Sequence, residues 1–288
     1  MTLRAVFYGL AENERLNFIL TNRIPRRALT RFMGWFSKIE RPIVRDCSLA
    51  IFRLLCAPDL TDAKKRKFNS LHDCFIRELK EGARSIDSSG NVLVSPCDGI
   101  VGAAGAIRDT RLLQVKGFTY TLEELLRDPE LAALYRDGNY VTLRLTAGMY
   151  HRFHAPYACR TERVTHIPGD AWNVNPPALK RIERLYCRNE RAVLSLQLAG
   201  DQHLVTLVAV AAVLVAGIRL RFLDVPFERN SEGPTVMRCA ATFAKADELG
   251  WFEHGSTVLV LAPAGFTLCE NIGEGKLIRM GQPLLLHP

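Results

Sequence analysis

Three short segments of the 288-residue sequence hold side chains that could do acid–base or nucleophilic chemistry. The first is a turn in which the carboxylate of Asp98 precedes Gly99. The second holds two histidines three residues apart, His151 and His154. The third places Ser256 between a glycine and an apolar run. Each feature alone is common, since an Asp–Gly pair usually only forms a turn.

Together the three segments supply a carboxylate, an imidazole and a hydroxyl. A serine hydroxyl becomes a nucleophile when an imidazole accepts its proton, and a carboxylate can hold that imidazole in the required tautomer. The combination therefore predicts chemistry at Ser256. The G-x-S-x-G elbow of α/β-hydrolases is absent, because Thr257 and Val258 follow this serine. No third ligand cluster accompanies the paired histidines, so we expect no metal.

The elements that position these residues begin with a basic, amphipathic N-terminal region. Residues 1–50 hold nine Arg or Lys against four Asp or Glu. Leu29, Phe32, Met33 and Phe36 recur at helical spacing, and a second apolar-periodic stretch covers residues 43–56. This pattern fits helices lying in a membrane interface. A helix packed on the protein's own core is the alternative, and no nucleic-acid-binding motif accompanies the charge.

From residue 91 onward, short apolar runs alternate with turn residues, which predicts a mainly β body. A helical insert is expected over residues 121–135, because Thr121 is followed by acidic residues typical of a first helical turn. The predicted fold class is α+β, with N-terminal helices over residues 1–65 and a barrel- or sandwich-like catalytic domain over residues 66–288. The predicted strands lie at residues 92–94, 100–101, 112–115, 140–145, 193–198, 205–215, 258–261 and 276–280.

The cysteines and the longest uncharged run bear on the cellular compartment. The eight cysteines form no CxxC pair, and we expect reduced thiols in a cytosolic protein without a signal peptide. The uncharged run over residues 204–218 is shorter than the roughly 20 residues that span a bilayer. It predicts a buried strand, a bend and part of a second strand.

Nine motif blocks follow one another along the chain. They are F-x-R-x-L-K at 75–80, G-A-R-x-I-D at 82–87, P-x-D-G at 96–99, K-G-x-x-Y-x-L at 116–122, Y-H-R-x-H-x-P at 150–156, I-P-G at 167–169, R-N-E-R at 188–191, G-S-T at 255–257 and G-Q-P-L at 281–284. In these blocks, and over nearly its whole length, the sequence resembles the phosphatidylserine decarboxylases in their short bacterial form.

The resemblance implies a zymogen that cuts its own Gly255–Ser256 bond by autocatalytic serinolysis. Asp98, His154 and Ser256 would form the charge relay for this cleavage. Ser256 would then become a covalent pyruvoyl group, the enzyme's cofactor, which forms a Schiff base with the substrate. His151 would assist the decarboxylation step. The enzyme would be a carboxy-lyase of phospholipid biosynthesis that converts phosphatidylserine to phosphatidylethanolamine and CO₂.

The resemblance also implies partners. A β chain of residues 1–255 and an α chain of residues 256–288 would form a heterodimer, which could dimerise further. The protein would bind an anionic phospholipid membrane, peripherally and on the cytoplasmic side of the cell membrane, and no nucleic acid. The family usually has Leu where this chain has His254. We hypothesise that this imidazole makes self-cleavage pH-sensitive.

Three alternatives remain open at the level of the sequence. A Ser-His-Asp hydrolase would use the same residue types and keep Ser256 intact. A lipoyl-like or biotinyl-like β module would explain the glycine-rich segment 275–283, but the lysine such a module needs at a hairpin tip is not seen. A family member without activity is disfavoured, because Asp98, His154 and Ser256 are all present.

Overall fold

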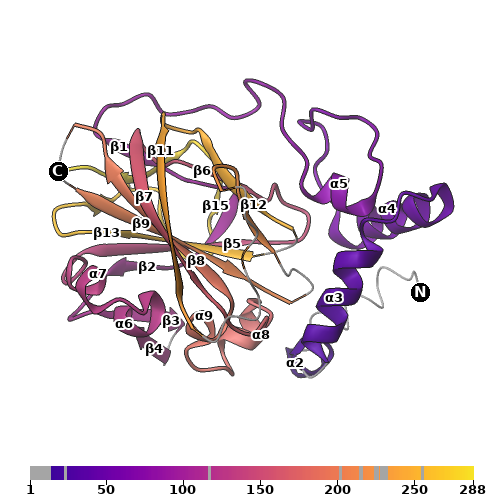
Figure 1. Cartoon of the computed structure of the whole chain (residues 1–288), viewed down its shortest axis with the longest axis horizontal. Coiled ribbons are helices and arrows are strands. Elements are labelled where there is room, and N and C mark those ends of the chain that lie inside the picture. Colours follow the sequence, from indigo (N-terminus) through magenta and orange to yellow (C-terminus); the bar gives the residue numbers. More distant parts are fainter. Residues whose placement is uncertain are drawn as a thin grey trace.

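The N-terminal helices lie together on one side of a β body in the computed structural model (Figure 1). The structure describes residues 14–22, 25–115, 118–200, 203–213, 217–223, 227, 233–253 and 256–288. The helices are α2 (Glu14–Asn22), α3 (Arg26–Phe36), α4 (Pro42–Cys56) and α5 (Leu71–Phe75). Pro42 starts α4 rather than breaking it, because the first helical position needs no N–H partner.

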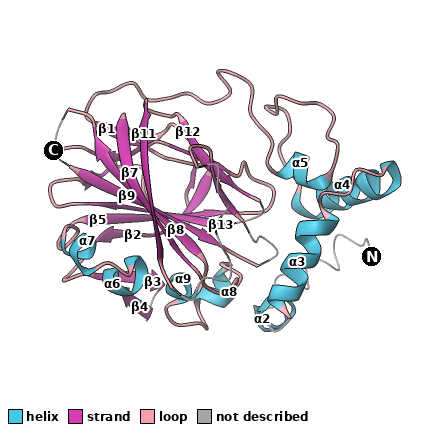
Figure 2. Cartoon of the chain, viewed as in Figure 1, coloured by secondary structure: helices cyan, strands magenta, loops and turns pink. Residues whose placement is uncertain are grey.

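The body is built on one antiparallel sheet of eight strands in the order β11-β7-β8-β9-β13-β5-β2-β15. Figure 2 shows how strands dominate this part of the chain. The strands are β2 (Gly99–Ala106), β5 (Asn139–Leu145), β7 (Cys159–Ile167), β8 (Arg191–Leu198), β9 (Leu204–Ala211), β11 (Thr235–Phe243), β13 (Ser256–Ala262) and β15 (Leu277–Ile278).

Three smaller sheets and four short helices complete the described fold. One sheet has the order β1-β16-β14, one β10-β12-β6, and β3 pairs with β4. Their bounds are β1 (Val92–Val94), β3 (Arg111–Val115), β4 (Phe118–Thr121), β6 (Arg152–His154), β10 (Ile218–Leu220), β12 (Glu248–Phe252), β14 (Thr267–Leu268) and β16 (Pro283–Leu286). The helices are α6 (Leu122–Leu126), α7 (Pro129–Ala133), α8 (Pro176–Leu179) and α9 (Leu185–Arg188). The predicted α+β class is confirmed.

Strand β13 lies at the centre of the core. All of its residues are buried, and alternate side chains enter two different apolar clusters. Val258 and Val260 face one cluster, whereas Leu259 and Leu261 face the other. A strand buried on both faces explains why this segment reads as a continuous apolar run.

Several expectations need correction in detail. The predicted insert over residues 121–135 is two short helices, because Pro129 starts α7, although the Thr121–Glu124 capping box opens α6 as expected. The run 204–218 does form a strand and the start of another, but β9 already ends at Ala211.

All eight cysteines are free. In the described part of the chain, no helix is both long and apolar enough to cross a membrane.

Candidate active site

Ser256 is the first residue of the central strand. It pairs with Leu145 at the end of β5 and with Ala211 at the end of β9. Its side chain is 0% exposed, and its Oγ has no hydrogen-bond partner among the described residues. Burying a hydroxyl without a partner costs free energy, so such an atom calls for a functional explanation.

Ser256 lines a pocket of about 820 Å³ between this end of the sheet and the N-terminal helices. The start of β13 lies on the side of the body that faces α3 (Figure 1). The helical wall of the pocket is mostly apolar and includes Met33, Phe36, Val44, Ile51, Phe52 and Phe75. The pocket therefore offers an apolar environment beside a reactive residue type.

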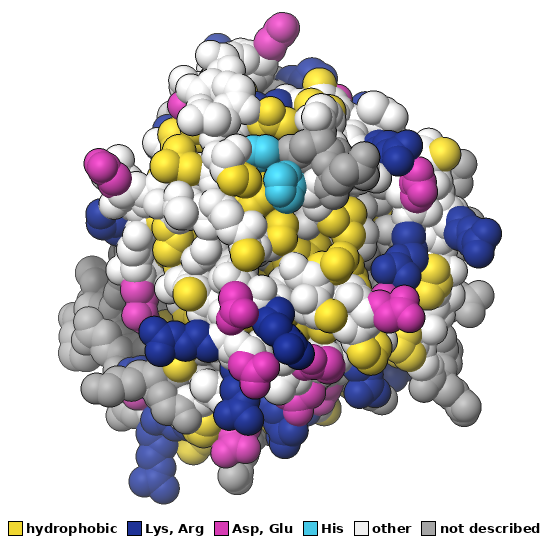
Figure 3. Space-filling view, turned by 90° about the vertical axis from the view of Figure 1, so that its left-hand side faces the viewer, with side chains coloured by type: hydrophobic (Ala, Val, Ile, Leu, Met, Phe, Trp, Pro, Cys, Tyr) yellow, Lys and Arg dark blue, Asp and Glu magenta, His cyan; other side chains and the backbone are white. Residues whose placement is uncertain are grey.

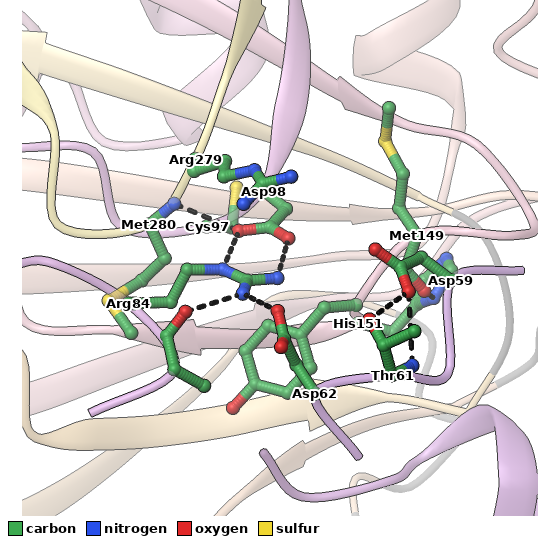
Figure 4. A network of polar contacts seen from close by, with 12 residues as sticks. Asp59, Thr61, Asp62, Arg84, Cys97, Asp98, Met149, His151, Arg279 and Met280 are labelled. Carbon is green, nitrogen blue, oxygen red and sulfur yellow. Dashed lines mark hydrogen bonds and ion pairs between the residues drawn. The ribbon is translucent and has the colours of Figure 1, made fainter. Parts of the chain in front are cut away.

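His151 lies at the edge of this pocket. Its ring packs against that of Phe75, a pocket-lining residue, with ring centroids 4.0 Å apart and the ring planes tilted by 36°. Its Nδ1 donates to the Met149 carbonyl at 2.8 Å, because a carbonyl can only accept (Figure 4). Its own carbonyl accepts a hydrogen bond from the backbone N–H of Phe252, which is four residues before Ser256. The end of β12 thus holds His151 beside the segment that leads to Ser256.

His154 lies further along the same segment, on β6 and opposite Glu248. Its Nδ1 donates to the Ala246 carbonyl at 2.8 Å, so Nε2 accepts the hydrogen bond from the Tyr150 hydroxyl at 3.0 Å. Burial lowers the pKa of His154 below its ordinary value, although the hydrogen bond to Ala246 opposes this shift. The ring is therefore neutral at neutral pH, with a basic Nε2.

Asp98 is buried and held by an arginine. Its carboxylate accepts hydrogen bonds from Arg84 Nε at 3.0 Å, from Arg84 Nη2 at 2.6 Å and from the Met280 N–H at 2.9 Å (Figure 4). Within the described part of the chain, no hydrogen bond joins Asp98 to His154, or either of them to Ser256. The structure thus places all the predicted side chains in buried positions but does not connect them in one hydrogen-bonded chain.

The register of the β10-β12-β6 sheet explains why His154 and His151 lie apart. Strand β6 runs antiparallel to β12, so His154 lies opposite the start of β12, whereas His151 contacts its end. Three residues of extended chain cover about 10 Å. The two histidines therefore lie at different distances from the end of β12, the strand that precedes Ser256. Gly255 and His254 lie outside the described residues, and the hypothesis about His254 stays a prediction.

The sequence reasoning missed Glu253, a buried carboxylate beside the site. Its Oε1 lies 3.5 Å from Lys38 Nζ, 3.6 Å from His72 Nε2 and 3.5 Å from Arg219 Nε. Burial alone would raise the pKa of Glu253, but the hydrogen bond from His72 and the charge of Lys38 lower it to about 2. No sequence signal marks this cluster, because its members are far apart in the chain.

Known proteins similar to this chain agree on one family. The profile described as phosphatidylserine decarboxylase matches residues 71–286. The phosphatidylserine decarboxylase proenzyme of Haemophilus influenzae is 32% identical, over 94% of this chain and 96% of that protein. The proenzyme of Halorhodospira halophila is 34% identical over 94% of each chain. The one from Myxococcus xanthus is 32% identical over 94% of this chain and 98% of its own.

Proposed function

Because this chain belongs to the phosphatidylserine decarboxylase family, we propose that it converts phosphatidylserine to phosphatidylethanolamine and CO₂ after cutting its own Gly255–Ser256 bond. The observation that carries the proposal is the buried Ser256 hydroxyl, which has no partner among the described residues and lines a large apolar pocket. A phospholipid substrate needs apolar volume for its acyl chains next to the reacting group. The curated relatives are named proenzymes, which supports maturation by cleavage.

Ser256 is the residue that would carry a covalent pyruvoyl group. The position fits such a group, because the Oγ atom is buried and the surrounding wall is apolar. A pyruvoyl group supplies a carbonyl that withdraws the electron pair released when CO₂ leaves. The β13 ladder on both sides of Ser256 holds this end of the strand in one place.

The remaining side chains would move protons. Cleavage starts when a base takes the hydroxyl proton of Ser256 and the oxygen attacks the carbonyl carbon of Gly255. The C–N bond between the two residues then breaks as the nitrogen takes up a proton, and loss of the Ser256 α-proton expels residues 1–255 as a free carboxylate. We assign this base to His154, supported by Asp98, and we assign to His151 the proton delivered to the product carbon. The position of His151 against the pocket wall supports its role. Tyr150 is the partner that His154 must release, or use as a relay, to act as a base.

The N-terminal helices would dock the enzyme on the membrane. Large apolar side chains on α3 and α4 are exposed in the described structure, among them Phe32, Trp35, Ile43 and Ile51. The same helices form the outer wall of the pocket, so a lipid in the membrane would lie close to the site. On the face of the body turned away from the helices, hydrophobic side chains lie over the centre, and acidic and basic side chains lie side by side below them (Figure 3).

Intact mass spectrometry of the purified full chain tests the proposal. We expect two masses for the wild type, for residues 1–255 and for the 33 residues 256–288, and one unbroken chain for Ser256→Ala. Ser195→Ala, on β8 and not among the pocket-lining residues, is the matched control and should be cut like the wild type. Phosphatidylserine vesicles should yield phosphatidylethanolamine only with the cut forms. An active, unbroken wild-type chain would contradict the proposal.

A further inference from the structure

Arg144 occupies the pocket wall beside Ser256. It is the residue before Leu145 on β5, and the ladder pairs Leu145 with Ser256 and Arg144 with Thr257. Neighbouring strands lie about 4.8 Å apart. The distance between the backbones of β5 and β13 is therefore shorter than one lipid headgroup. Among the described residues that line this pocket, Arg144 is the only charged one.

The Arg144 guanidinium has no hydrogen-bond or ion-pair partner in the described part of the chain. Two other arginines of low exposure do have partners, since Arg84 binds Asp98 and Arg191 donates to four backbone carbonyls. Burial lowers the pKa of Arg144 from its ordinary value, and only the Tyr186 hydroxyl opposes this shift. Because an arginine stays charged at neutral pH, the wall carries a half-buried cation that lacks an anion.

We propose that Arg144 binds the phosphodiester of the substrate lipid and so holds its headgroup over Ser256. This inference rests on the proposed function and names the group that recognises the substrate's charge. Arginine suits a phosphate because its planar fork donates two parallel hydrogen bonds. The remainder of the pocket wall is then left to the acyl chains and to the carboxylate that is lost.

The substrate headgroup has two anionic groups, and the chemistry separates them. A guanidinium on the carboxylate would stabilise a charge that disappears from that group as CO₂ leaves, and this would favour the ground state over the transition state. The phosphate keeps its charge throughout the reaction. A cation bound to the phosphate therefore contributes to substrate binding without opposing the reaction, which makes the phosphate the expected ligand.

The product separates the two possibilities, because phosphatidylethanolamine keeps the phosphate and lacks the carboxylate. For Arg144→Gln we expect KM for phosphatidylserine and the inhibition constant of phosphatidylethanolamine to rise by the same factor, about 10- to 100-fold for loss of a charged hydrogen bond. We expect kcat to stay within about threefold, and Arg144→Lys to recover part of the loss. Arg160→Gln, which removes an exposed charge of β7, is the matched control and should change neither constant.

Two outcomes would overturn the inference. If both constants stay at the wild-type values, Arg144 does not bind the headgroup. If KM rises while the inhibition constant stays the same, Arg144 binds the carboxylate instead. An inactive or uncut wild type would refute the proposed function rather than this inference. If Arg144→Gln fails to mature, phosphatidylethanolamine binding to uncut Ser256→Ala, with and without Arg144→Gln, decides the question, and equal affinities would refute it.

Discussion

His151 and His154 belong to one motif, yet the structure gives them different surroundings. The ring of His151 contacts Phe75 in the pocket wall. The ring of His154 instead accepts a hydrogen bond from the hydroxyl of Tyr150, which precedes β6. Because side-chain direction and strand register separate the two rings, substitutions at the two histidines can be tested independently. The assignment of one base to cleavage and one acid to decarboxylation can thus be examined directly.

We predict that His154→Asn slows cleavage of the precursor by at least 100-fold, because general-base catalysis typically contributes a factor of 10² to 10⁴. His151→Asn should leave cleavage within about tenfold of the wild type and slow decarboxylation by 100-fold or more. The first effect is read from intact mass over time, the second from phosphatidylethanolamine formed by the cut enzyme. If His151→Asn blocks cutting and His154→Asn does not, the two roles are exchanged.

The lowered pKa of Glu253 predicts that the stability of the fold depends on pH. Burial by itself raises its pKa, but His72, Lys38 and Arg219 together lower it from 4.5 to about 2 in the folded chain. A folded pKa below the unfolded one stabilises the protein above pH 4.5, and this contribution is lost as the pH falls toward 2. Glu253→Gln should therefore reduce the free energy of unfolding by roughly 1–3 kcal/mol at pH 6.

Urea unfolding at pH 6 and pH 3 measures this contribution. The difference between wild type and Glu253→Gln should shrink at the lower pH, because the wild-type carboxylate is then losing its advantage. Glu162→Gln removes an exposed carboxylate and serves as the control, with an effect near zero at both values. Equal differences at pH 6 and pH 3 would show that the ion pairs do not stabilise the fold.

At the scale of elements, α4 carries both buried and exposed apolar side chains beside the pocket. Phe52, Ile43 and Ile51 all line it, but Phe52 is buried, whereas Ile43 is 80% and Ile51 56% exposed. Exposed isoleucines on a helix cost free energy in water and favour an interface with lipid. The same helix lines the pocket, so the proposed docking on a membrane and access to Ser256 would depend on one element.

We predict that the double variant Ile43→Asp, Ile51→Asp weakens binding to phosphatidylserine-containing vesicles by at least tenfold, because each change removes apolar burial in the interface. Vesicle co-sedimentation measures the partition. Leu134→Asp is the matched control, since Leu134 is 53% exposed but lies on the body after α7. If both variants bind vesicles like the wild type, the helices are not the docking surface.

At the scale of the whole molecule, the strands after the proposed cut are built into sheets with strands that precede it. Strand β13 lies between β9 and β5, β15 pairs with β2, and β16 pairs with β1. The four strands of the proposed 33-residue α chain thus share sheets with the proposed β chain. Cutting one bond at the edge of β13 leaves these contacts in place.

We predict that the two chains stay associated after cleavage. They should elute together from a size-exclusion column in native buffer and separate in concentrated guanidinium, because only non-covalent contacts then join them. The uncut Ser256→Ala precursor should elute at the same native volume. Loss of the short chain on the native column would show that the strand pairing does not hold it.

The sequence by itself determined a helix around residues 29–36, a helix over residues 43–56, about half of the described strands, and the family. The elements depend on local periodicity and turn residues, which a short window of sequence contains, whereas the family depends on the order of the motif blocks along the chain. Strands β4, β6, β7, β11, β12, β14 and β16 were not predicted. Strand β11 is a sheet edge with alternating exposed residues, so it lacks the apolar run that marked the others.

Only the tertiary structure decided how the chemical groups lie. Motif order brought Asp98, His154 and Ser256 into one hypothesis, but strand register set which histidine is beside the pocket. The Glu253 cluster and the place of Arg144 in the pocket wall, without a partner among the described residues, also depend on how segments far apart in the chain come together. Side chains acquire such neighbours when strands pair, and the pairing depends on the burial of the whole core rather than on any local pattern.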